Sequence, residues 1–290
     1  MSEQVCEADM GGDGAAGVDT YGYPVETTGN AVLDILEHRS STRAFARDDN
    51  DRPVAVTDEQ RAAILHAASR APSAGAMMMY SIVSIREQTM LDRLADLCDH
   101  QPMIAKAPWA LIFVVDYAKW IDLFEHVGCF GPEFVERTGK SPRRAPGLGD
   151  FAIAAQDAVI AAQNAVVAAE ALGLGSCYIG DIVENAEEVA GLLDLPPYTM
   201  PLSMLIIGTP RKERPAIAHP VVNLVHEERY CRAGATTMDA QVAEMDAMFR
   251  PHAREVGERV VDIYTRKHTS PFMAEMSRSM EWWFKNWLGK

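Results

Sequence analysis

The chain lacks most of the features that mark a metal-binding, secreted or nucleic-acid-binding protein. Its five cysteines are scattered and odd in number, and no pair has CxxC spacing. Lys and Arg number 27 against 41 Asp and Glu, so the net charge of −14 leaves no broad basic surface for a phosphate backbone. No basic region followed by an apolar run opens the chain. We expect a cytoplasmic protein with reduced thiols, no metal and no nucleic-acid partner.

One long apolar run, residues 151–175, is the only stretch that resembles a membrane span. Its polar residues recur at seven-residue intervals: Gln156 and Asp157, Gln163 and Asn164, then Glu170. At 100° per residue these positions form a single narrow stripe on an otherwise apolar, alanine-rich helix. The pattern predicts a helix buried in a core or a subunit interface, and no membrane partner.

Composition divides the chain into three parts. Residues 1–28 hold six acidic side chains, five glycines and no Lys or Arg, which is typical of a flexible tail. Residues 29–230 carry the candidate strands and motifs. Residues 231–290 look helical and end in the Trp-rich "MEWWFKNW". A Gly- and Pro-containing stretch, 128–150, predicts a loop or lid within the middle part.

Helical and strand patterns alternate along the middle part. Short apolar runs at 80–85, 110–116 and 203–208 predict buried strands. Helices are expected at 89–98, at 184–194, and from Thr57, whose capping-box pattern with Gln60 marks a start, to about Arg70. The first helix begins near residues 29–30, and its buried face should consist of Val32, Leu33, Ile35 and Leu36.

Four local motifs are weak when each is taken alone. "RSSTR", 39–43, places three hydroxyls between two arginines; it suits an anion, but also an ordinary turn. "APSAG", 71–75, allows close backbone approach to a flat ligand, or is a simple helix-to-strand turn. "GLGSCYIGD", 173–181, is not GxGxxG and follows a helix, which disfavours a Rossmann nucleotide site. "TPRKERP", 209–215, adds a basic loop after the third strand.

The order and spacing of these motifs, together with "QPMIAKAPWALIFVVD" at 101–116, resemble the nitroreductase family of FMN-binding flavoproteins. The resemblance covers roughly residues 30–230, and "MMMYSI" and the C-terminal segment look closest to a branch found in anaerobic bacteria. It implies an α+β nitroreductase-like fold of three layers, with a central mixed or antiparallel sheet flanked by helices. It also implies a homodimer with FMN at the interface, in which the long helix contributes to the interface and the C-terminal extension, with Trp282, Trp283 and Trp287, wraps the partner.

The resemblance also implies a set of FMN-binding residues. Arg39, Ser41 and Arg43 would hold the phosphate, with backbone from Ser40, and Lys212 and Arg214 would reach it from the C-terminal side. The isoalloxazine ring would lie against two backbone segments: Pro72, Ser73, Ala74, Gly75 and Ala76, and Ile179, Gly180 and Asp181. The family usually has Asn where this chain has Ala76 and Gln where it has Met78. No residue is singled out as a catalytic acid or base.

The implied function is that of an NAD(P)H-dependent FMN oxidoreductase. NAD(P)H would give a hydride to FMN in a ping-pong reaction, and the electrons would pass to a nitroaromatic, a quinone or a related small acceptor. Two alternatives stay open. The same fold could catalyse reductive dehalogenation or substrate dehydrogenation. A non-enzymatic flavin-binding sensor is the second, because the amides usually found at positions 76 and 78 are missing.

Overall fold

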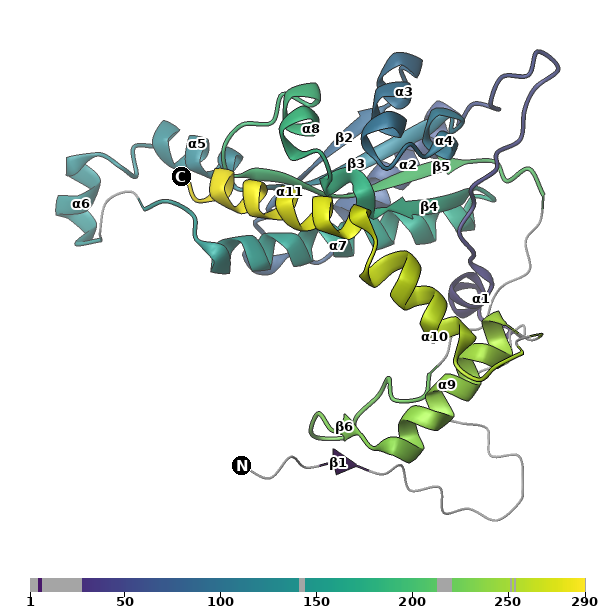
Figure 1. Cartoon of the computed structure of the whole chain (residues 1–290). Coiled ribbons are helices and arrows are strands. Elements are labelled where there is room, and N and C mark those ends of the chain that lie inside the picture. Colours follow the sequence, from purple (N-terminus) through teal and green to yellow (C-terminus); the bar gives the residue numbers. More distant parts are fainter. Residues whose placement is uncertain are drawn as a thin grey trace. The chain divides into compact units, whose positions relative to one another are not determined.

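The computed structural model describes residues 5–6, 28–140, 144–212, 221–250, 252 and 254–289. The chain divides into two compact units. Unit 1 comprises residues 1–38 and 215–273, and unit 2 comprises residues 39–214 and 274–290. Unit 2 contains the four-stranded sheet and most of the predicted motifs (Figure 1).

The sheet of unit 2 is antiparallel, with the strand order β2-β3-β5-β4. The three predicted strands are present as β2 (Tyr80–Ile85), β3 (Trp109–Asp116) and β5 (Thr199–Gly208). Sequence analysis missed β4 (Gly175–Ile179), which pairs with β5 from Gly175↔Gly208 to Ile179↔Met204. Its short, Gly- and Ser-containing sequence has little of the β-branched character that identifies a strand.

Helices cover both faces of the sheet, which makes three layers. Along β3, Trp109, Leu111, Phe113 and Val115 face one core and Ala110, Ile112 and Val114 face the other, as the two-residue period of a strand requires. The first core packs against α2 (Asp58–Ser69) and α7 (Leu148–Ala171). The second packs against α3 (Gln88–Leu97), α4 (Pro102–Ala105) and α8 (Ala186–Leu192). The predicted α+β layered fold is confirmed.

The long helix α7 is the predicted apolar helix. By length and composition it could cross a membrane. In the structure six of its alanines are fully buried against the sheet and α2: Ala154, Ala158, Ala161, Ala162, Ala165 and Ala169. These small side chains let the helix approach its neighbours closely. The predicted capping box at the start of α2 is also present, with the Thr57 side chain accepting from the Gln60 N–H and Gln60 accepting from the Thr57 N–H.

The segment between β3 and α7 holds two further helices, α5 (Ala118–His126) and α6 (Pro132–Thr138), so part of the predicted loop 128–150 is helical. Arg144 donates to both oxygens of Asp150 near the start of α7, at 2.7 and 2.8 Å. The C-terminal helix α11 (Pro271–Trp287) buries Trp283 and Trp287 completely within unit 2. Their own chain therefore covers these two aromatic side chains, contrary to the expectation that a partner subunit would do so.

Unit 1 contains α1 (Ala31–His38), α9 (Ala235–Phe249), α10 (Glu258–Ile263), the turn η3 (Tyr264–His268), and β1 (Val5–Cys6), which pairs with β6 (Arg232–Ala233). The predicted buried face of α1 is wrong. Val32, Leu33 and Leu36 are each about half exposed, and none of the helix's residues is buried. Cys98, Cys129 and Cys177 are free thiols, as expected, but Cys231 is disulfide-bonded, so the prediction of five reduced thiols is wrong there.

Candidate functional site

The hydroxyl- and arginine-rich segment 39–43 lies along the edge of the sheet. Thr42 donates its backbone N–H to the Ser176 carbonyl of β4 at 2.8 Å, on the side of β4 away from β5. The following residues pair with the chain after β5, where Phe45 bridges Pro210 and Arg211 donates its N–H to the Ala44 carbonyl at 3.0 Å. Two motifs about 170 residues apart in the sequence are therefore neighbours.

Two glycines make this close approach possible. A Cβ added at Gly175 would lie 2.7 Å from Thr42 Cβ and 3.0 Å from Pro210 Cγ. A Cβ at Gly208 would lie 2.6 Å from Pro108 Cγ and 2.8 Å from Phe45 Cδ1. All four distances are shorter than a normal carbon–carbon contact. The missing side chains let segment 39–46 lie directly against β4 and β5.

The polar end of α7 lies near this segment. Burial raises the pKa of Glu170 to about 7, and the nearby Arg39 guanidinium opposes the shift. Burial likewise raises the pKa of Tyr178 on β4 to about 12, again opposed by Arg39. The Tyr178 hydroxyl donates to Gln163 Oε1 of α7 at 3.3 Å. Glu170 and Tyr178 are therefore two partly buried polar groups on which the charge of Arg39 acts.

Two buried polar atoms at this edge have no hydrogen-bond partner among the described residues: Glu170 Oε1 and Ser176 Oγ. Buried polar atoms are nearly always paired, so these two have room for a hydrogen bond from an ordered water or a ligand. The segment that lies along this edge carries two arginines, Arg39 and Arg43, and three hydroxyl residues at 40–42, and the Arg39 guanidinium lies near Glu170. Guanidinium forks with hydroxyls are the donor set that a phosphate requires, so the residues fit a phosphate group.

The small-residue loop lies beside another part of α7. Residues 72 and 74–76 are exposed, and Gly75, Ala76 and Met78 have φ angles of 57°, 56° and 48°. The turn η1 (Ala74–Ala76) is held by the buried Asp157 of α7, which accepts the Ala74 N–H at 2.9 Å. Trp120 of α5 donates its ring N–H to the Met77 carbonyl at 2.9 Å. The exposed surface of this loop is therefore mostly backbone, as contact with a flat ring requires.

The third predicted segment, Ile179–Asp181, forms the end of β4 and the start of the turn η2 (Gly180–Val183). Ile179 is buried and Gly180 is exposed. The Gln101 amide donates to Asp181 Oδ2. Burial, with the charges of Asp181, Asp99 and Glu275, raises the pKa of the neighbouring Glu184 to about 7. The turn thus precedes a buried acidic group.

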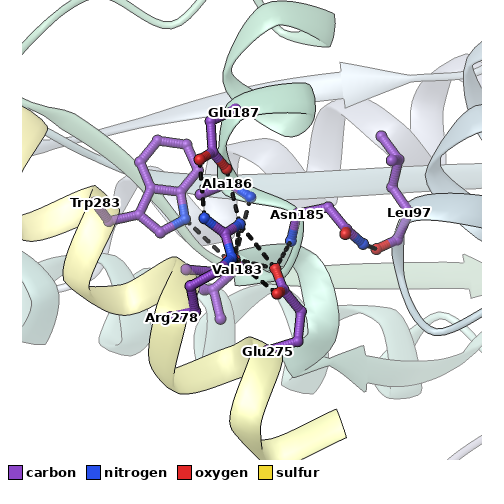
Figure 2. Close-up of polar contacts among 9 residues, drawn as sticks. Leu97, Val183, Asn185, Ala186, Glu187, Glu275, Arg278 and Trp283 are labelled. Carbon is purple, nitrogen blue, oxygen red and sulfur yellow. Dashed lines mark hydrogen bonds and ion pairs between the residues drawn. The ribbon is translucent and has the colours of Figure 1, made fainter. Parts of the chain in front are cut away.

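The C-terminal helix fastens the chain that follows this turn (Figure 2). The Trp283 ring N–H donates to the Val183 carbonyl at 2.9 Å, and Ser279 Oγ accepts the Ala186 N–H at 3.2 Å. Arg278 forks between Glu187 and Glu275, with N···O distances of 2.8–2.9 Å. Asn185, at φ 46°, donates its side-chain amide to the Leu97 carbonyl at 2.8 Å. Helix α11 therefore fixes η2 and the start of α8 by side-chain and backbone contacts together.

The structure brings some of the predicted residues together and separates others. Segment 39–43 lies beside β4 and beside the exposed Lys212 loop. The small-residue loop contacts Asp157, which is 13 residues before Glu170 on α7, about 20 Å along the helix axis. Arg214 lies outside the described residues.

Three contacts were not predicted from the sequence: Thr42 against Gly175 at the β4 edge, Asp157 with the loop at 74–79, and Glu170 with Arg39. The signal for the last two was present, because polar residues in an alanine-rich buried helix need partners. Their partners could not be found from sequence, because each lies on an element remote in the chain.

Known proteins resemble this chain in sequence and in fold. A model of the nitroreductase family matches residues 36–209. The FMN reductase [NAD(P)H] of Bacillus subtilis is 31% identical over 215 residues, which cover 73% of this chain and 79% of that protein. The oxygen-insensitive NADPH nitroreductase of Salmonella typhimurium is 31% identical over 202 residues, 69% of this chain and 74% of that protein. The solved structure of the hypothetical oxidoreductase YcnD from Bacillus subtilis superposes with a TM-score of 0.71 at 25% identity, covering 88% of this chain and 97% of that one.

Proposed function

The chain belongs to the nitroreductase family, and from this premise we propose that it is an FMN-dependent oxidoreductase that takes electrons from NAD(P)H. The observation that carries the proposal is the convergence of segment 39–43, the edge of β4 and the loop after β5, beside the buried, unpartnered hydroxyl of Ser176. A phosphate-bearing cofactor is the ligand that such a surface fits best.

Arg39, Ser40, Ser41 and Arg43 would hold the phosphate of FMN, and Lys212 and Arg214 would approach it from the loop after β5. The backbone of Pro72, Ser73, Ala74, Gly75 and Ala76 would face the ring, as would that of Ile179, Gly180 and Asp181. When bound, FMN supplies the hydride chemistry, in which NAD(P)H and a nitroaromatic, quinone or related acceptor react in turn at one site. The protein's part is to bind and orient.

A homodimer completes this proposal. Within one chain the small-residue loop and the phosphate-binding segment lie beside different parts of α7. A second copy packed along α7 would supply the loop to the phosphate segment of its neighbour. Ile153, Val159 and Ile160 of α7 are each about 40–50% exposed, which leaves an apolar stripe for such a contact. Light scattering on the flavin-loaded protein should give about twice the chain mass, and a flavin-loaded monomer would contradict the shared site.

The phosphate assignment is tested by comparing FMN with riboflavin, which has the same ring and no phosphate. Arg43→Ala should weaken FMN by about ten- to a hundredfold, the loss of one charge-assisted hydrogen bond, and leave riboflavin nearly unchanged. Arg47→Ala is the matched control, because Arg47 is an exposed arginine four residues further on that pairs with Asp51 at 3.4 Å. Equal losses for both flavins in Arg43→Ala would refute the assignment.

The acceptor is tested separately. The relatives named above are reductases, which favours an enzyme over a flavin-binding sensor. A sensor predicts a yellow protein whose absorbance near 450 nm, about the flavin maximum, stays unchanged when NAD(P)H is added without oxygen. An anaerobic screen of nitroaromatic, quinone and halogenated acceptors, started from the reduced protein, separates simple reduction from reductive dehalogenation.

A further inference from the structure

The loop Ala74–Met79 holds an unusual backbone conformation. Three of its residues, Gly75, Ala76 and Met78, have positive φ angles, and only the first is a glycine. Residues with a Cβ disfavour this left-handed region, so they adopt it only where surrounding contacts enforce it. Contacts outside the loop must therefore determine its shape.

Asp157 supplies contacts at both ends of the loop. Its Oδ1 accepts the Ala74 N–H at 2.9 Å, and its Oδ2 accepts the Met79 N–H at 3.3 Å. The side chain is only 2% exposed, so both bonds are made away from competing water. Hydrogen bonds to an ionised acceptor are stronger than neutral ones. One carboxylate thus clamps the two ends of this six-residue loop.

The other hydrogen bonds hold single positions of the loop, and one of them comes from the core, where Asp116 donates its backbone N–H to the Met79 carbonyl at 3.1 Å. Met78 donates its N–H to Ser73 Oγ at 3.2 Å, which is a bond inside the loop itself. Trp120 holds the Met77 carbonyl from α5. Lys119 donates its ammonium N–H to the Tyr80 carbonyl, and its positive charge interacts electrostatically with Asp157. Asp157 therefore contributes the only side-chain acceptor that joins both ends of the loop to the core among the described residues.

We propose that Asp157 is a positioning residue for the flavin ring: it acts through the backbone of Ala74–Met79 and not by touching the cofactor. The identity of the ligand in this inference rests on the proposed function. The effect of Asp157 on the loop is independent of the proposed function, because it is expected in the protein without flavin. The clamp presents the left-handed turn to the ring in one fixed shape, so the ring meets preorganised backbone.

The test uses Asp157→Asn and Asp157→Ala in the full chain, with Asn164→Ala as the matched control. Asn164 lies two turns further along α7 and donates to the Ala67 carbonyl at 3.1 Å, so it removes a comparable helix-to-backbone contact that does not involve the loop. Hydrogen exchange of the Ala74 and Met79 amides is measured by NMR in the flavin-free protein. FMN and riboflavin affinities and the reduction potential are measured in the loaded protein.

We expect both amides to exchange at least tenfold faster in Asp157→Ala, and only one of them in Asp157→Asn, because the new amide keeps one acceptor oxygen. FMN and riboflavin should weaken by the same factor, about tenfold, and the reduction potential should shift, because the effect is at the ring. Unchanged amide exchange in both Asp157 variants, or the same changes in Asn164→Ala, would overturn the proposal. Faster exchange with no flavin bound by any variant, wild type included, would instead refute the flavin proposal and leave the clamp in place. If Asp157→Ala does not fold, Asp157→Asn alone decides the outcome.

Discussion

Gly175→Ala tests whether the edge of β4 positions segment 39–43. A methyl group at this position would lie 2.7 Å from Thr42 Cβ, which is inside any normal carbon contact. Thr42 is only 4% exposed and its N–H is bonded to Ser176, so it cannot move aside without the segment moving with it. The clash therefore acts on the side chain of Thr42 at its Cβ, which is bonded to the backbone and cannot rotate away from the added methyl group.

Overpacking of this kind costs about 1–3 kcal/mol. Replacing a glycine also restricts the unfolded chain, which offsets the loss by about 0.4–1 kcal/mol. We expect the free energy of unfolding to fall by about 0.5–2.5 kcal/mol. Because the displaced segment carries Arg39 and Arg43, FMN affinity should fall by about tenfold or more, and riboflavin affinity should fall less.

The assay is urea unfolding of the flavin-free protein, followed by titration of both flavins. Gly191→Ala is the control, because this glycine lies in α8 with nothing within 4 Å of an added Cβ. There a methyl group should stabilise the helix by about 0.5–1 kcal/mol. The reasoning is refuted if Gly175→Ala matches Gly191→Ala in stability and binds FMN as the wild type does.

Three further predictions follow from other parts of unit 2. Ala76→Gly should raise the free energy of unfolding in urea by about 0.5–1 kcal/mol, because Ala76 has a φ of 56°. Ala76→Asn should also raise stability, and it should increase the affinity for both flavins if its amide reaches the ring. Unchanged stability in both variants would contradict the left-handed conformation of residue 76. Burial raises the pKa of Glu170 to about 7, so the folded state holds this proton longer than the unfolded chain and stability falls as pH rises from the ordinary carboxyl value to about 7. Between pH 5 and 8 the melting temperature should fall less in Glu170→Gln than in the wild type. Glu184 has its pKa raised to the same range, but it is present in both proteins, so its contribution cancels in this comparison. Parallel profiles of the two proteins would refute the assignment of the effect to Glu170. Trp283→Phe should cost about 1–3 kcal/mol, because it leaves the buried Val183 carbonyl without its donor. Arg278→Ala should cost less than Trp283→Phe, because that ion-pair network is partly exposed to water; the reverse order would show that the ion pairs dominate.

Sequence patterns predicted the parts of the fold that are encoded locally. The apolar runs of β2, β3 and β5 and the capping box of α2 carry their signal within a few residues, and all are present. β4 was missed because its strand character comes from pairing with β5 and not from its own residues. The apolar face of α1 gave a false signal, because amphipathic spacing shows that a face can be covered but not what covers it.

The candidate site divides in the same way. The sequence "RSSTR" showed the residue types that an anion needs. The seven-residue spacing of polar residues on α7 predicted that they share one face of the helix. That Asp157 reaches the loop at 74–79 and that Arg39 lies near Glu170 are facts of tertiary packing. The roles of the glycines were also hidden, since Gly175 and Gly191 look alike until their neighbours are known.

The Asp157 clamp has a consequence for the order of folding. The two residues it bonds lie 83 and 78 positions earlier in the chain, so the contact closes a long loop and is entropically slow to form. Helix α7 must form and dock on the sheet before the left-handed turn can be held. During synthesis the turn emerges well before the helix that shapes it, and a newly made chain therefore passes through a stage in which its strands β2 and β3 can pair while its ring-facing loop has no fixed conformation.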